Sequence, residues 1–174
     1  MKRARGFTLI ELLVVIAIIG LLATFAVVQL GASREKARDT KRKQDLVQMQ
    51  KAIELYYNEN GSYPNTGGAW RGGGSGCTYG PYSTTGTTGY IPGLAPQYIG
   101  VLPLDPRPGT RAWPCTTIGQ SCYLYNSNGT DYKLIAHCGI EGAFPKPDEP
   151  FYDPYRPTWG IMVCNQGSTA CAGW

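Results

Sequence analysis

Apolar and polar positions divide the N-terminal third of the chain into two stretches. Residues 7–30 are almost wholly apolar, whereas residues 34–60 are charged and contain no glycine. From Leu46 onward, apolar and aromatic side chains recur every three to four positions, which is typical of one face of an α-helix. Asn60-Gly61 then supplies a helix-ending signal. The pattern predicts one helix over residues 7–60, about 80 Å long if continuous, far longer than an average globular helix.

Shorter apolar segments in the second half of the chain predict strands. Residues 121–126 and 131–138 are rich in Tyr, Leu and Ile, and Asn128-Gly129 between them is a hairpin signal. Residues 159–164 offer a third strand. We therefore expect an α+β fold in which the distal half of the long helix packs on a small antiparallel sheet.

Residues 65–121 show neither a helical nor an alternating pattern. The stretch is rich in Gly, Thr, Ser, Pro and Tyr, so we expect a long surface loop. Within it, Tyr90–Pro96 is expected to form a short apolar turn that covers the helix. Arg71–Gly74 is not a phosphate-binding loop, because it lacks both the Walker motif and a preceding strand.

The apolar run over residues 7–30 is long enough to cross a membrane. As a helix it spans about 36 Å, against a hydrocarbon core of about 30 Å. Lys2, Arg3 and Arg5 precede it, and because positive flanks stay cytoplasmic, the rest of the chain is placed outside. A secretory signal cleaved near Thr24-Phe25-Ala26 and a plain membrane anchor both fit these features, but neither explains Glu11.

Glu11 lies near the start of this apolar run. An ionised carboxylate costs about 2.5–3.5 kcal/mol at the centre of a membrane helix, and less near the interface. Glu11 is an interfacial group that stays hydrated, a carboxyl that protonates, or a partner for a positive charge inside an assembly. The candidates for that charge are the basic leader residues and a newly formed α-amino group.

The residues around Glu11 resemble the class III signal of type IV pilins and type II secretion pseudopilins. That signal combines a short basic leader, a glycine, a phenylalanine, a glutamate four residues further on and an unbroken apolar helix, as in Arg5–Ile16. The resemblance implies that prepilin peptidase cleaves between Gly6 and Phe7 and that Phe7 is N-methylated. It also implies that Glu11 pairs with the N-terminal amine of a neighbouring subunit in a dry filament core, where an unpaired charge costs several kcal/mol.

Two further phrases resemble the same family. Tyr56–Pro64 is similar to the aromatic–Asn–Gly–x–Tyr–Pro end of the pilin helix, and Leu102–Pro106 to the Leu-Pro-x-Asp-Pro phrase of major pseudopilins. The resemblance implies the type IV pilin fold. It also implies a cleaved leader peptide over residues 1–6, a transmembrane and filament-core helix over 7–30, its amphipathic continuation over 31–60, and a globular head over 61–174.

The same resemblance implies a structural protein and not an enzyme. Its expected partners are copies of itself in a helical filament, prepilin peptidase, an inner-membrane assembly platform and, before assembly, membrane lipid. We expect a single-pass inner (cytoplasmic) membrane protein with its head outside, which later enters a cell-surface or periplasmic filament. A type IV pilin is the leading interpretation. The alternatives are a major pseudopilin of a type II secretion system and a minor or tip adhesin pilin.

The six cysteines favour disulfide bonds. All lie beyond the apolar run, and an even number of cysteines in an exported region is typical of an oxidising compartment. The sequence does not choose among the possible pairings, although Cys115 with Cys122 and Cys164 with Cys171 could each close a small loop. The disulfide candidates are Cys77, Cys115, Cys122, Cys138, Cys164 and Cys171.

The distribution of charge argues against a nucleic-acid partner. The net charge is +4, but the basic leader supplies most of it, and residues 61–174 hold as many acidic as basic side chains. Residues 34–43 carry six bases and two acids with no aromatic side chains among them. We interpret that segment as a solvated helix face and expect no nucleic-acid binding.

Catalysis and metal binding also have little support. His137 is expected to be half buried beside a disulfide-bonded cysteine. Strand neighbours point to opposite faces, so His137 and Cys138 are not expected to meet as base and nucleophile. Asp148, Glu149 and Asp153 lie in a proline-rich segment. Major pseudopilins are known for a calcium site in their C-terminal loop region, but the carboxylate spacing here does not match it, and we expect a solvated acidic loop. We therefore expect no cofactor and no metal site.

Overall fold

The computed structural model describes residues 7–74, 77, 79–107, 121–165, 167 and 170–174. The chain forms two compact units, Met1–Ala37 and Arg38–Trp174. We call the second of these the head unit. Helix α1, Leu9–Asn60, contributes residues to both units.

Helix α1 ends where the sequence predicts. Gly61 follows it with φ 68°, in the left-handed region that glycine adopts without strain, and its N–H donates to the carbonyl of Tyr57 at 2.8 Å. The side-chain amide of Asn60 donates to the carbonyl of Tyr56 at 2.8 Å. These bonds satisfy carbonyls that a helix end otherwise leaves without partners. At the other end, α1 begins two residues later than predicted, at Leu9.

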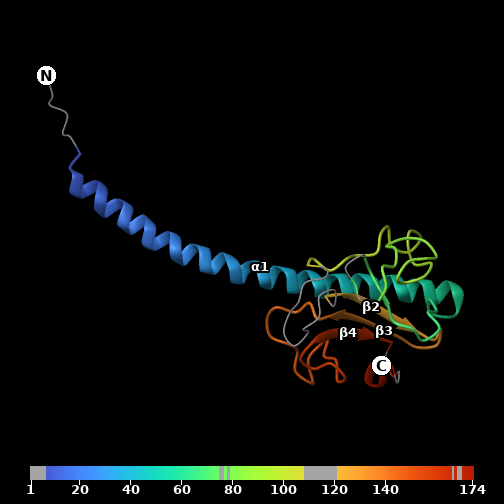
Figure 1. Cartoon of the computed structure of the whole chain (residues 1–174). Helices are drawn as coiled ribbons and strands as arrows, with labels where there is room; N and C mark the ends of the chain where they lie inside the picture. Colours follow the sequence, from blue (N-terminus) through green and yellow to red (C-terminus); the bar gives the residue numbers. More distant parts are fainter. Residues whose placement is uncertain (1–6, 75–76, 78, 108–120, 166, 168–169) are drawn as a thin grey trace. The chain divides into compact units, whose positions relative to one another are not determined.

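One antiparallel sheet forms the centre of the head unit (Figure 1). Its strands are β1 (Arg71–Gly72), β2 (Cys122–Ser127), β3 (Tyr132–His137) and β4 (Gly160–Cys164), in the order β1-β2-β3-β4. The three predicted strands are therefore confirmed to within two residues at each end, and the α+β fold with them. Strand β1 and the short helix α2 (Ala170–Gly173) were not predicted.

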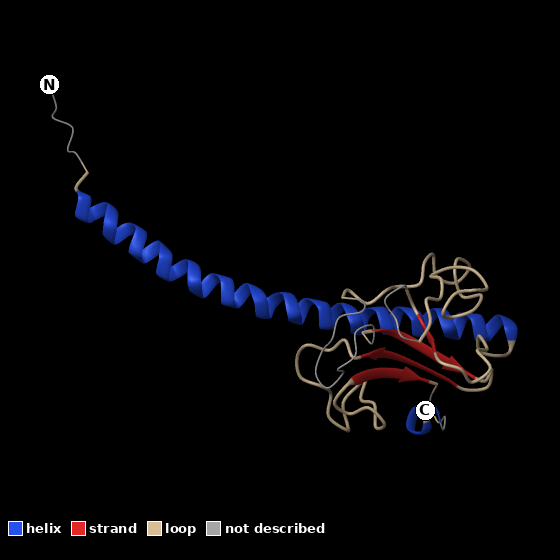
Figure 2. Ribbon diagram, viewed as in Figure 1, coloured by secondary structure: helices blue, strands red, loops and turns tan. Residues whose placement is uncertain are grey.

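Side chains alternate between the two faces of this sheet. Tyr123 and Tyr125 of β2 join a cluster with residues of α1, whereas Cys122 and Leu124 join a second cluster on the other face. This two-residue period is that of a strand buried on both sides. Figure 2 shows the strands beside the distal part of α1. The α1 residues in the main core are Leu46, Met49, Ala52 and Ile53.

Tyrosine hydroxyl groups also join the sheet to α1. The Tyr123 hydroxyl donates to Asp45 Oδ2 at 2.8 Å, and the Tyr132 hydroxyl donates to Glu54 Oε1 at 3.0 Å. Burial, followed by the facing carboxylate, raises the pKa of both phenols, so they stay protonated donors. These polar pairs help to fix how the helix lies on the sheet, because a buried phenol needs an acceptor and the carboxylates of Asp45 and Glu54 supply one.

Part of residues 65–121 belongs to the core. Tyr90, Ile91 and Leu94 are fully buried and pack in the main cluster with α1. The Tyr90 hydroxyl donates to the carbonyl of Pro103 at 2.6 Å. The apolar turn expected at Tyr90–Pro96 therefore covers the helix, and a surface loop describes only part of this stretch.

Candidate functional site

The first candidate site is the chain start. Residues 1–6, including Gly6, lie outside the described residues. Phe7 precedes α1 and is 78% exposed. The structure therefore shows Phe7 as an accessible residue next to the first helical turn, and does not place the peptide bond predicted to be cleaved.

Glu11 takes part in a hydrogen-bonded cap at the start of α1. Its Oε2 accepts from the N–H of Thr8 at 2.8 Å and from the Thr8 hydroxyl at 2.7 Å. The Thr8 hydroxyl in turn accepts from the N–H of Glu11 at 3.2 Å. This is a capping box, in which Thr8 is the N-cap and Glu11 the third helical residue. Thr8-Leu9-Ile10-Glu11 carries the Thr-x-x-Glu signature, which could have revealed this role from the sequence.

The apolar part of α1 is exposed on every side in the single chain. Its most apolar window has a mean hydropathy of 2.7 with none of it buried, and α1 is long and apolar enough to cross a membrane. Such a helix requires lipid or other apolar helices around it. Its exposed large side chains include Leu9, Ile10, Leu12, Leu13, Val14, Val15, Ile16, Ile18, Ile19, Leu21, Leu22 and Phe25.

A second site lies in the head unit, around the buried guanidinium of Arg42. Arg42 is 1% exposed, and its Nε and Nη2 donate to the two oxygens of Asp105 at 2.8 and 3.0 Å. Its Nη1 donates to Asp39 at 2.8 Å and to Glu141 at 3.2 Å. The expectation of a solvated face over residues 34–43 is therefore wrong at Arg42, which is buried and forms a bidentate ion pair with Asp105.

The Glu141 carboxylate accepts hydrogen bonds from three arginines in the same network. It accepts from Arg38 Nε at 2.6 Å and from Arg107 Nη1 at 2.8 Å, besides the bond from Arg42. Hydrogen bonding by Arg38, followed by that from Arg107 and Arg42 and opposed by burial, lowers the pKa of Glu141 to about 2. The network joins α1 to the chain around residues 105 and 141.

Gly139 makes room for the bond between Arg42 and Asp105. A Cβ added at this position would lie 2.7 Å from both Arg42 Nε and Asp105 Oδ2. Asp105 comes from the Leu102–Pro106 phrase noted in the sequence. That phrase therefore supplies the buried carboxylate that holds Arg42, a role that sequence reasoning missed.

Disulfide bonds join distant and near segments of the head unit. Cys77 bonds to Cys122, and Cys164 bonds to Cys171. The small loop considered for Cys115 with Cys122 is therefore wrong, because Cys122 is joined to a cysteine 45 positions earlier. Cys138 is also disulfide-bonded, and Cys115 lies outside the described residues.

His137 and Cys138 are closer than strand alternation predicts. Strand β3 ends at His137, and Cys138 has φ 55°, so the alternation of faces does not continue through it. Cys138 Sγ lies 3.7 Å from His137 Nε2, and His137 is fully rather than half buried. The sulfur is disulfide-bonded, so it is not a thiol nucleophile.

The acidic segment near residue 150 is only partly solvated. Asp148 and Glu149 are exposed, but Asp153 is 1% exposed and accepts from Lys133 Nζ at 2.8 Å. Within the described ranges, no three His, Cys, Asp or Glu side chains are grouped as a metal site requires. The donor set of this segment does not fit calcium, because its buried carboxylate already has a protein cation.

Comparison with known proteins connects these features to a family. Residues 1–27 match the family profile described as the prokaryotic N-terminal methylation motif. Type II secretion system core protein G of Klebsiella pneumoniae is 46% identical over 66 residues, which are 38% of this chain and 47% of that protein. The protein of the same name from Vibrio cholerae is 41% identical over 66 residues, which are 38% of this chain and 45% of that protein.

A type IV pilus protein is similar to the chain as well. Type IV wide pilus major component PilA4 of Thermus thermophilus is 48% identical over 63 residues, which are 36% of this chain and 48% of that protein. The chain thus spans about half the length of the curated relatives it matches. No solved structure matches the chain.

The chain thus combines the prokaryotic N-terminal methylation motif with a long N-terminal helix packed on an antiparallel sheet. Over 63 to 66 residues it is similar to type II secretion system core proteins and to a type IV pilus protein.

Proposed function

We propose that this chain is the structural subunit of an extracellular filament of the type IV pilus class. The observation that carries the proposal is the exposed apolar part of α1, in a chain whose head unit has its own core. A surface of this kind is stable in lipid and then among the apolar helices of neighbouring copies. Contacts of that type are heterologous and do not close, so they build a helical polymer.

The proposed route to the filament begins with processing. Prepilin peptidase cleaves between Gly6 and Phe7, and the new amine of Phe7 is methylated. The match of residues 1–27 to the methylation motif supports this step. Residues 1–6 are the leader, 7–30 the membrane and filament-core segment, 31–60 the helix continuation, and 61–174 the head. An inner-membrane assembly platform then moves the subunit from lipid into the filament.

Within the filament, Glu11 is proposed to pair with the Phe7 amine of a neighbouring copy. A carboxylate in an apolar run is costly, and its retention requires a partner. The pair acts as a register device, because only one axial offset between copies places amine and carboxylate together.

The main alternative is a major pseudopilin of a type II secretion system. Several relatives carry the name type II secretion system core protein G, which favours it. Its filament remains periplasmic, whereas a pilus reaches the cell surface. A minor or tip adhesin pilin is the second alternative, since the aromatic loops could serve surface binding.

The test is mass spectrometry of filaments sheared from cells that express the chain. We expect a subunit that begins at methylated Phe7 and keeps residues 7–174. A mature start near Val27 indicates an ordinary secretory signal, and retention of Met1 indicates a plain anchor; either result contradicts the proposal. Replacing Gly6 with a bulky residue should leave an unprocessed precursor in the membrane and no filaments.

Electron microscopy and secretion assays separate the alternatives. Deletion of the gene should remove surface filaments and leave secreted proteins unchanged if the subunit builds a pilus. Loss of protein secretion with no change in surface filaments instead assigns the chain to a secretion pseudopilus. If surface filaments remain but adhesion falls, the chain is a minor or tip adhesin pilin.

A further inference from the structure

Lys133 is a fully buried lysine on the face of the sheet that lies away from α1. Its neighbours along β3 at every second position belong to that face, as Ile135 does, whereas Leu134 packs in the main core. Lys133 is 0% exposed. A buried ammonium is costly without close partners, so its surroundings must be built to receive it.

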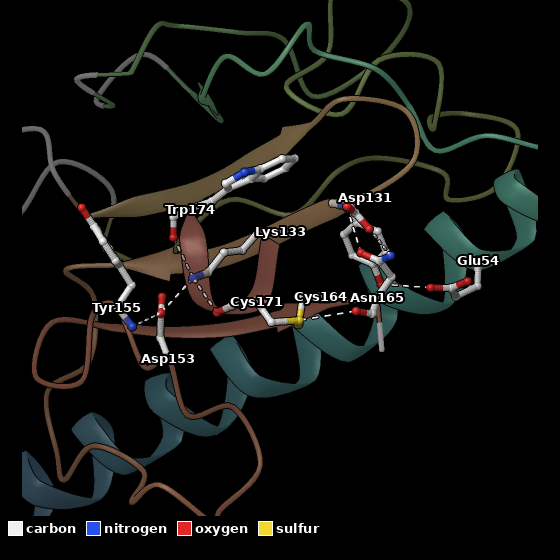
Figure 3. The surroundings of a disulfide bond; sticks show 10 residues. Glu54, Asp131, Lys133, Asp153, Tyr155, Cys164, Asn165, Cys171 and Trp174 are labelled. Atoms are coloured by element: carbon white, nitrogen blue, oxygen red, sulfur yellow. Dashed lines mark hydrogen bonds and ion pairs between the residues drawn. A yellow bond between two sulfur atoms is a disulfide. The ribbon is translucent and has the colours of Figure 1, made fainter. Parts of the chain in front are cut away.

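Three oxygens surround the Lys133 ammonium. Its Nζ donates to Asp153 Oδ1 at 2.8 Å, to the carbonyl of Cys171 at 3.2 Å and to the main-chain oxygen of Trp174 at 2.8 Å. Figure 3 shows these groups converging on Nζ from the loop before β4 and from the segment after it. An ammonium has three donors, and all three are used here.

Neighbouring groups hold these oxygens in place. Disulfide bond Cys164–Cys171 ties the segment with the Cys171 carbonyl to the end of β4. Arg156 Nη1 donates to the same Trp174 oxygen at 2.6 Å. The Arg156 guanidinium lies over the rings of Trp70, Tyr155 and Trp159, at 5.0, 4.9 and 5.4 Å from their centroids.

A carboxylate with two main-chain oxygens is the donor set of a hard cation such as calcium. Here the protein supplies the cation itself. We infer that the Lys133 ammonium acts as a built-in cation that docks the segment Cys171–Trp174 onto the sheet, in place of a bound metal ion. The inference does not depend on the proposed filament function, because it concerns only contacts within one chain.

Two consequences follow: the first distinguishes this arrangement from a bound metal ion, and the second distinguishes it from ordinary packing. Docking of Cys171–Trp174 should be independent of divalent cations. Removal of the ammonium should leave an oxygen-lined cage that a small cation can fill. A segment held only by its disulfide bond and by apolar contacts has neither dependence on charge nor a response to added cations.

The test uses the full chain in detergent with its disulfide bonds intact, and hydrogen–deuterium exchange of the peptide that contains residues 171–174 as the readout. For the unaltered chain, exchange should be equal in EDTA and in millimolar calcium. In Lys133→Met, which keeps most of the side-chain volume, exchange should rise about tenfold, because a buried charged hydrogen-bond partner is lost. Peptides from β2 and from α1 should keep their protection, and the exposed Lys51→Met serves as the matched control with no change.

Lys133→Ala supplies the second arm of the experiment. Methylammonium should restore protection of residues 171–174 in this variant, whereas tetramethylammonium, which has no N–H donor, should not. Unchanged exchange in Lys133→Met would overturn the inference, as would release of the segment from the unaltered chain by EDTA. If Lys133→Met does not fold, Asp153→Asn, which weakens the cage without enlarging it, should show the same selective loss; protection equal to the unaltered chain then overturns the inference.

Discussion

Glu11 can be separated into a capping role and a docking role by residue substitution. Glu11→Gln keeps an acceptor for the Thr8 cap but removes the charge, whereas Glu11→Val removes both. We expect both variants to insert and to lose the leader normally, since each removes a costly charge from the apolar run. Filaments should be few or absent for Glu11→Val and reduced for Glu11→Gln. Filament yield is measured by shearing and electron microscopy, with methylation of Phe7 checked in both.

The matched control is Thr8→Ala. It removes the two hydroxyl contacts of the cap, at a cost of about 1 kcal/mol of helix stability, but keeps the Glu11 carboxylate and the N–H of residue 8 that donates to it. We expect filament yield close to that of the unaltered chain. Wild-type yield from correctly processed Glu11→Val would show instead that this carboxylate is not the docking group.

Gly139 should be intolerant of even one added carbon. In Gly139→Ala, the new Cβ lies 2.7 Å from Arg42 Nε and Asp105 Oδ2, so the buried ion pair must open. The loss of unfolding free energy should be on the order of 3 kcal/mol, as for other broken buried pairs. Denaturant unfolding followed by tryptophan fluorescence measures it. Gly100→Ala is the control, because a Cβ there meets nothing within 4 Å. Equal stability of the two variants would refute this role for Gly139.

The sequence could not reveal the network around Arg42. Charged residues alternate densely over residues 34–43, which favours a solvated face, and local pattern carries no information about Asp105, 63 positions away. The same limit applies to Lys133, whose strand neighbours are apolar but whose partner Asp153 follows it by 20 positions. By contrast, the capping box lies within four consecutive residues and was readable from the sequence.

At the scale of elements, the two described disulfide bonds should differ in their contribution. Cys77–Cys122 closes a loop with a sequence separation of 45, and Cys164–Cys171 one of 7. Loop-closure entropy then predicts losses of about 4 and about 2 kcal/mol when each pair is replaced by alanine. Thermal unfolding of the two double-alanine variants measures which loss of stability is larger. A larger loss for the short loop would show that its contacts with Lys133, and not chain entropy, dominate.

Element boundaries followed from local signals where those signals were strong. The long helix and the three strands β2, β3 and β4 were predicted because their apolar period persists over several residues. Strand β1 was missed because Arg71–Gly72 is too short to show a period and exists only by pairing with Tyr125 and Leu124 of β2. Helix α2, with four residues, is also too short to show a period, and the Cys164–Cys171 bond ties it to the end of β4.

At the scale of the whole molecule, acid should weaken the head unit, because it protonates the carboxylate that binds arginines of α1. The pKa of Glu141 is lowered from 4.5 to about 2, chiefly by its bonds to Arg38. An acid with a depressed folded pKa stabilises the fold above its unfolded pKa, and this stability is lost as the pH falls from about 4.5 toward 2. Melting temperature measured in detergent against pH should therefore drop in that window.

Glu141→Gln provides the comparison for that pH profile. The variant should be less stable at neutral pH, and its melting temperature should fall less between pH 4.5 and 2, because the carboxylate that titrates there is gone. Parallel curves for the two proteins would show that other carboxylates cause the acid sensitivity.

The bond between Thr8 and Glu11 has a consequence for how copies could join and separate. A carboxylate that already holds two donors is not an empty acceptor when a neighbour's amine arrives. For the proposed pair, docking is then an exchange of partners. Its driving force is the difference in free energy between Glu11 bonded to Thr8 and Glu11 bonded to the neighbour's amine. In the proposed filament, a subunit still in lipid keeps its Glu11 carboxylate bonded to Thr8, and one that leaves the filament regains the same contacts.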